Sequence, residues 1–114
     1  MPDPQESRRA QRKPVNIAAE VIDAISGRSM GQLGNLSASG MLLIGHEAPR
    51  SEAIYQLHLP LPGLGVPPPT IEVGVQEQWH EEAATPGQVW AGYRIIAIGE
   101  EATAQLQRWL DTHG

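Results

Sequence analysis

The sequence of 114 residues contains no cysteine and no phenylalanine, and aromatic residues make up only 4% of it. Without cysteine, the chain can form neither a disulfide nor a thiolate metal site, and it has no thiol nucleophile. No apolar run approaches the roughly 20 residues that span a bilayer, and the first fourteen residues lack the apolar core of a signal peptide. We therefore expect a cytoplasmic protein that is neither exported nor inserted into a membrane.

Motifs of catalysis and of metal binding are also missing. The sequence has no G-x-S-x-G nucleophile turn, no Walker-type loop and no dinucleotide fingerprint. Its histidines are far apart and lack metal-ligand spacing: His46, His58, His80 and His113. We therefore expect a protein that is not an enzyme and that holds no metal and no cofactor.

Positive charge is scarce and unevenly placed. The net charge is −5, yet residues 1–14 carry +2 and the remainder −7, because half of all lysines and arginines lie within residues 8–13. A basic arm on an acidic body suits a small anion better than a long polyanion, which the rest of the surface would repel. We expect no nucleic-acid partner. A barrel that clamps nucleic acid with the arm is a less favoured alternative, because single-strand binders need aromatic platforms.

Apolar and polar residues alternate in several segments, which is typical of half-buried strands. The first strand follows Pro14 and places one set of side chains on one face: Val15, Ile17, Ala19, Val21 and Ile25. A turn is expected at 26–29, followed by a strand through Met30 and Leu33 into "NLSASG" at 35–40. Further strands are predicted from a short apolar run at 41–44, from two alternating segments at 53–61 and 70–79, and from a β-rich run at 88–98.

The end of the chain changes to a helical period. Apolar residues at i, i+4, i+7 and i+8 predict an amphipathic helix over about 99–112: Ala102, Leu106, Trp109 and Leu110. The proline-rich stretch 60–69 is predicted to be an exposed loop. Six strands and one helix favour a mostly β domain over residues 15–114, either a small antiparallel barrel or a sandwich. Residues 1–14 are predicted to be a flexible arm.

The "NLSASG" stretch has three interpretations. The first is a turn, and the second is a glycosylation sequon, although the sequence has no secretory signal. The third is one part of a ligand site. As a strand, it would point Asn35, Ser37 and Ser39 outward as a neutral polar row, while Leu36 and Ala38 point into the barrel. The glycine that follows would tolerate a bulge or a close backbone approach.

The arm offers a complementary element. In an extended segment, Arg8 and Arg12 share a side, with the small Ala10 between them. Arginine can bind phosphate with two hydrogen bonds, donate hydrogen bonds to the O6/N7 edge of guanine, or stack on the guanine ring. The R-x-x-x-R spacing alone is more typical of a solvated basic tail than of a ligand site.

Taken together, the two stretches resemble the PilZ domain family, whose signature is R-x-x-x-R followed by [D/N]-x-S-x-x-G. Arg8 and Arg12 match the first motif, and Asn35, Ser37 and Gly40 match the second. The resemblance runs through the whole chain. Its later landmarks correspond to "VQEQW" at 75–79 and to "VWAGYRI" at 89–95, where a tyrosine replaces the family's phenylalanine.

The resemblance implies a six-stranded antiparallel barrel of the split-barrel type with a C-terminal helix, and a receptor for cyclic di-GMP. It implies that Arg8 and Arg12 contact phosphate and guanine, that Asn35 and Ser37 hydrogen-bond the ligand, and that Gly40 shapes the strand end. Arg9 and Ser39 are secondary candidates for ligand contact.

The resemblance also implies a mode of action. Ligand binding is expected to order the arm on the barrel. A single domain then passes the signal to an unidentified effector protein, with outputs such as motility, biofilm formation or virulence. The alternative is a PilZ-type assembly factor that acts in pilus or flagellar function without ligand.

Overall fold

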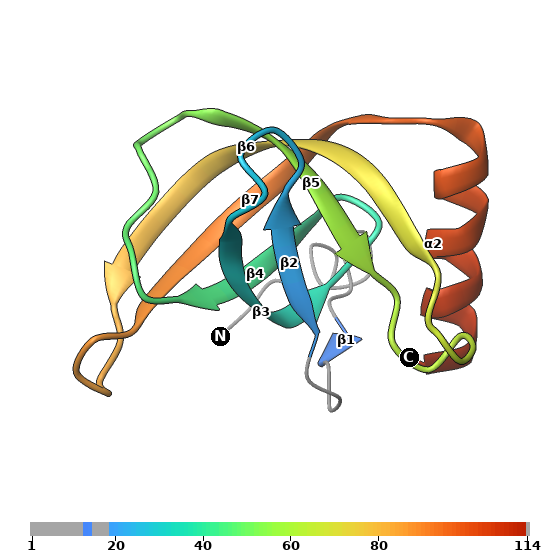
Figure 1. The fold of residues 1–114 in the computed structure, drawn as a ribbon, viewed down its shortest axis with the longest axis horizontal. Helices are drawn as coiled ribbons and strands as arrows, with labels where there is room; N and C mark the ends of the chain where they lie inside the picture. Colours follow the sequence, from blue (N-terminus) through green and yellow to red (C-terminus); the bar gives the residue numbers. More distant parts are fainter. Residues whose placement is uncertain (1–12, 15–18, 114) are drawn as a thin grey trace, which may run out of the picture.

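The structure is a computed structural model that describes residues 13–14 and 19–113. The described residues form seven strands followed by one helix (Figure 1): β1 (Lys13–Pro14), β2 (Glu20–Asp23), β3 (Ser29–Leu36), β4 (Gly40–Gly45), β5 (Ile54–Pro60), β6 (Thr70–Glu82), β7 (Val89–Ile98) and α2 (Glu100–His113). Among these described residues, no helix combines the length and the apolar character that a membrane span requires.

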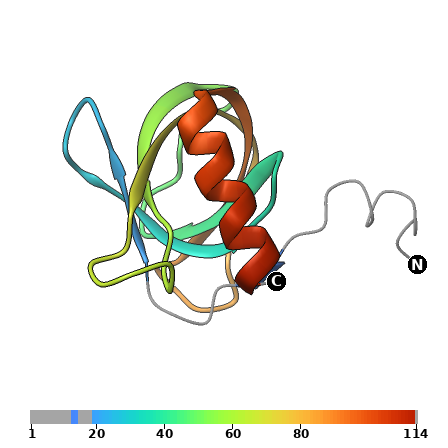
Figure 2. The same ribbon diagram turned by 90° about the vertical axis from the view of Figure 1, so that its right-hand side faces the viewer.

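Strands β2 to β7 close into a barrel. Their order around the sheet is β3-β2-β5-β6-β7-β4, and β4 pairs back with β3. Every pairing is antiparallel, and β1 pairs with the last two residues of β3, beyond those that pair with β2. Figure 2 shows α2 lying across the ring of strands. The predicted fold, a six-stranded antiparallel barrel with a C-terminal helix, is confirmed, and of the two architectures left open the barrel is the one observed.

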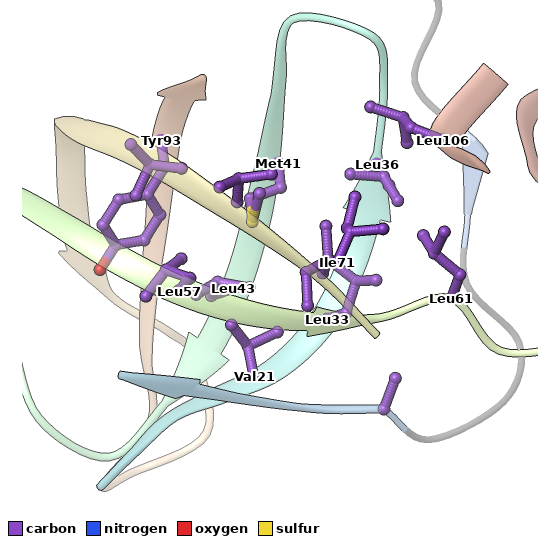
Figure 3. Packing of buried hydrophobic residues seen from close by; sticks show 14 of the residues in the cluster. Val21, Leu33, Leu36, Met41, Leu43, Leu57, Leu61, Ile71, Tyr93 and Leu106 are labelled. Carbon is purple, nitrogen blue, oxygen red and sulfur yellow. The ribbon is translucent and has the colours of Figure 1, made fainter. Parts of the chain in front are cut away.

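The core consists of inward-facing residues of the strands, joined by two residues of the helix. Leu57 and Leu59 on β5 are fully buried, as are Val73 and Val75 on β6. Figure 3 shows buried side chains from several strands meeting in the interior of the barrel. The alternation predicted for 53–61 and for the first half of 70–79 is therefore confirmed.

The predicted first strand is only partly correct. Ala19 and Val21 are buried as expected, whereas Ile25 is 85% exposed and lies in a turn. Strand β2 ends at Asp23, whose Oδ1 accepts hydrogen bonds from the backbone N–H groups of Ile25 (2.8 Å) and Ser26 (3.4 Å). An aspartate that bonds its own backbone two residues on starts a turn, so the alternation stops there. Val15 and Ile17 lie outside the described residues.

Trp79 also departs from prediction. Its alternation with Ile71, Val73 and Val75 placed it in the core, but its side chain is 40% exposed. The β6–β7 register shifts between Glu77 and Trp79, so one extra residue bulges from β6. A bulge reverses the alternation beyond it. Glu77 precedes the bulge and continues the inward alternation of Val73 and Val75, so it is buried, whereas Trp79 follows the bulge and faces outward.

The helix is confirmed with the predicted contact stripe. Leu106 and Trp109 are buried against the core, and the Trp109 indole N–H donates to the Pro62 carbonyl oxygen at 2.9 Å. That bond joins the helix to the proline-rich loop. Leu61 and Pro62 at the start of this loop are buried, so the loop is exposed only beyond them. The reason is that α2 covers its first residues.

Candidate functional site

The "NLSASG" stretch is a hairpin turn and not a continuous strand. Strand β3 ends at Leu36 and β4 begins at Gly40. The Ser37 N–H donates to the Gly40 carbonyl oxygen at 2.9 Å, which closes the turn. The Ser37 hydroxyl oxygen accepts from the N–H groups of Ser39 (3.2 Å) and Gly40 (3.1 Å). Its own proton can reach the Gly40 carbonyl or the Ser39 hydroxyl, each at 3.3 Å.

These bonds change which side chains face outward. Leu36 is buried as predicted, but Ser37 is also fully buried and Ala38 is exposed. The predicted outward row of Asn35, Ser37 and Ser39 is therefore wrong. A serine hydroxyl that bonds the next backbone N–H groups competes with the strand and bends it.

Gly40 lies where two strands approach closely. A Cβ atom at this position would collide with the carbonyl oxygen of Tyr93 on β7. The Ile95 N–H also donates to the Ser39 carbonyl oxygen at 2.8 Å. The predicted close backbone approach at this glycine is confirmed, and it holds the turn against β7.

Asn35 carries a buried acceptor. Its side-chain Oδ1 is inaccessible to solvent and has no hydrogen-bond partner among the residues that the structure describes. An unsatisfied buried polar group costs about 1–3 kcal/mol. This oxygen is therefore suited to a donor brought by a ligand or by another part of the chain.

Strand β1 brings the end of the arm to the same place. Lys13 pairs with Leu36 and Pro14 with Asn35, so the last two residues of the predicted arm are part of the sheet. Arg8, Arg9 and Arg12 lie outside the described residues. The peptide bond from Arg12 to Lys13 nevertheless joins the first motif covalently to the strand that borders the second.

An exposed indole lies on the outer face of the same region. Asn35 on β3 pairs with Leu42 on β4, Leu42 with Gly92 on β7, and Gly92 with Trp79 on β6. A Cβ atom at Gly92 would overlap the Trp79 ring, so the indole lies directly over this glycine. Neighbouring strands are about 4.8 Å apart, which puts Gly92 and the ring above it roughly 10 Å from Asn35.

Trp79 was not among the site residues predicted from the sequence. Gly92 was interpreted only as a family landmark, although a glycine within a strand indicates close approach of another group. The ring could have been found from that glycine and from the polar run that precedes Trp79.

A buried carboxylate stabilises the bulge that turns Trp79 outward. Glu77 Oε1 accepts from the Glu52 N–H at 2.8 Å, and Oε2 lies 2.6 Å from His80 Nδ1. Burial of Glu77 disfavours its charged form, but the bonds from Glu52 and His80 outweigh it and hold the pKa of Glu77 below its ordinary value. The carboxylate therefore stays ionised and bonded at neutral pH.

A cavity of about 510 Å³ lies at the other end of the β3–β4 hairpin. Its lining includes Arg28, His46, Tyr55 and Tyr93, and none of the predicted site residues. Among the described side chains, no group of three histidine, cysteine, aspartate or glutamate residues is placed to hold a metal ion. The polar and aromatic groups around Asn35 are therefore the better candidate for the predicted site.

Comparison with known proteins identifies the fold. No protein-family model and no curated protein matches the sequence. Among solved structures, the Bacillus subtilis inhibitor of motility MotI/DgrA matches with a TM-score of 0.70 and 16% identity over 89% of this chain and 49% of its own. MrkH, described as a c-di-GMP-dependent transcription regulatory factor, matches with a TM-score of 0.64 and 12% identity over 90% of this chain and 49% of its own.

These two likenesses confirm the predicted PilZ-like fold. The chain spans about half the length of each solved structure. At 12–16% identity, they bear on the fold and not on individual site residues.

Proposed function

We propose that this chain is a non-enzymatic receptor for cyclic di-GMP with a ligand site in two parts. Asn35 and Trp79 form the barrel part, and Arg8 and Arg12 of the arm form the other. Ser39 and Arg9 lie beside these groups in sequence and are secondary contacts. The proposal includes the cytoplasmic location expected from the sequence.

The observation that carries the proposal is the buried Asn35 Oδ1 without a partner among the described residues, two strands away from the exposed indole of Trp79. Guanine has N–H donors for such an oxygen and a π face for such a ring. Stacking of a base on an aromatic side chain contributes about 1–3 kcal/mol. A guanine nucleotide can therefore satisfy both groups at once.

We assign Ser37 and Gly40 to shaping the site. The Ser37 hydroxyl already accepts two backbone hydrogen bonds, and a hydroxyl oxygen has two lone pairs. Gly40 allows β4 to approach β7. Both residues hold the turn next to Asn35, so their substitution acts on the ligand through the backbone.

The arm supplies the positive charge that the barrel part lacks. Arg12 is bonded to Lys13, and Lys13 pairs with Leu36 at the end of β3. Guanidinium groups beside Asn35 would bind the phosphates with charge-assisted hydrogen bonds. Ordering of the arm then changes the surface that an effector protein meets, with motility, biofilm formation or virulence as outputs. The description of MrkH as c-di-GMP-dependent supports this ligand class.

Isothermal titration calorimetry of the whole chain with cyclic di-GMP, cyclic di-AMP and GTP tests the proposal. We expect binding of cyclic di-GMP and strong loss of affinity in Arg8→Ala, Arg12→Ala and Asn35→Ala. Arg108→Ala is a matched control, because Arg108 is an exposed arginine on α2. Wild-type affinity in the Arg8 and Arg12 variants would show that the site assignment is wrong. A partner complex that needs no ligand and ignores these substitutions would indicate an assembly factor instead.

A further inference from the structure

Arg94 lies on β7 beside the turn of the candidate site. It pairs with Gly40 on β4 and with Gln76 on β6. Its neighbour Tyr93 is buried, and Arg94 itself is exposed, so its side chain is on the outer face. None of the ion pairs between described residues includes Arg94. Its charge is thus available to an anion on that face.

The position of Arg94 is distinctive on an acidic barrel. Between residues 19 and 113 there are four arginines and no lysine. Arg28 forms an ion pair with Glu47 at 3.5 Å, beside the cavity at the far end of the β3–β4 hairpin. Arg50 follows β4, and Arg108 is on α2. Arg94 is therefore the arginine of the described side chains that pairs directly with the "NLSASG" turn.

Arg94 and Trp79 share the outer face around Gly92. Directly opposed residues of antiparallel strands point to the same side, and Gly92 is opposite Trp79. Arg94 is two residues further along β7, opposite Gln76, and so lies on the same outer face as Gly92 and the Trp79 ring above it. A ring for a base and a guanidinium for a phosphate thus lie on one face of the barrel.

We propose that Arg94 contacts a phosphate of the cyclic dinucleotide from the barrel side, opposite the arginines of the arm. This inference rests on the proposed function and adds a residue that neither sequence motif contains. A cyclic dinucleotide has two phosphates. The planar fork of Arg94 can donate two hydrogen bonds to one of them.

The test compares Arg94→Gln, Arg94→Lys and the control Arg108→Gln by calorimetric titration of the whole chain with cyclic di-GMP. We expect Arg94→Gln to weaken binding about tenfold, as for loss of a hydrogen bond to a charged group, and Arg108→Gln to leave it unchanged. Arg94→Lys keeps the charge but loses the fork, so its affinity should be intermediate. The gap between wild type and Arg94→Gln should narrow as salt screens the pair, which a purely structural role of Arg94 would not produce.

The possible results distinguish a failure of this inference from a failure of the proposed function. Equal affinity of wild type and Arg94→Gln, with Arg12→Ala impaired, would refute the role of Arg94 and leave the proposed function intact. A wild-type protein that does not bind the dinucleotide would overturn both. Thermal melting of each variant checks the fold, and the exposure of Arg94 predicts no change there.

Discussion

Replacing Ser37 by alanine should destabilise the protein even without ligand. The hydroxyl oxygen accepts hydrogen bonds from the N–H groups of Ser39 and Gly40. Gly40 is buried, so its N–H would lose its partner without gaining water, at about 1–3 kcal/mol. Ser39 is exposed, and water can replace the bond to its N–H. We expect Ser37→Ala to lower the free energy of unfolding by about 2 kcal/mol.

That loss corresponds to a melting temperature lower by roughly 10 °C for a domain of this size. Urea unfolding, followed by tryptophan fluorescence, measures the change in the free energy of unfolding, because Trp109 is buried in the folded state. Ser39→Ala is the control and should change the free energy by less than about 0.5 kcal/mol. If Ser37→Ala were as stable as Ser39→Ala, the turn would not depend on this hydroxyl, and Ser37 would be available for direct ligand contact after all.

Two further substitutions test the outer face and its support. Gly92→Ala should weaken ligand binding and alter tryptophan fluorescence, since a methyl group there overlaps the Trp79 ring; unchanged titrations and spectra would contradict the stacking role. Glu77→Gln should be less stable than wild type at neutral pH. Because the pKa of Glu77 lies below 4.5, its contribution is fully present above pH 4.5 and is lost as the pH falls through the folded value. The melting temperatures of wild type and Glu77→Gln should therefore converge as the pH is lowered from 7 to 3. A difference between them that stays constant over this range would refute this account.

The regular part of the fold was predictable because its pattern is simple. Leu57, Leu59, Val73 and Val75 alternate with polar residues, and a half-buried strand requires this alternation. Trp109 follows Leu106 at helical spacing, and both are buried where α2 packs against the core. In these segments, burial of one face determines the structure.

The errors arose where a local polar group overrides the alternation. Asp23 ends β2 before Ile25, and the Ser37 hydroxyl ends β3 before Ala38. Hydrophobic periodicity contains no information about either bond. The bulge after Glu77 reverses the facing of Trp79, and periodicity does not predict it because the Glu52 N–H that bonds the Glu77 carboxylate is 25 residues away in sequence. The role of the arm arginines stays a prediction, since they lie outside the described residues.

The pairing of β1 with β3 has a consequence for affinity. Lys13 pairs with Leu36 at the end of β3. In the proposed receptor, the arm is therefore a second binding module on a very short tether, and its local concentration at the barrel is set by chain length and not by the amount of protein. Tethers of this kind give effective concentrations in the millimolar range. The same arm supplied as a separate peptide would add little to binding, so the length of chain between Arg8 and β1 is itself a determinant of how much messenger the receptor needs.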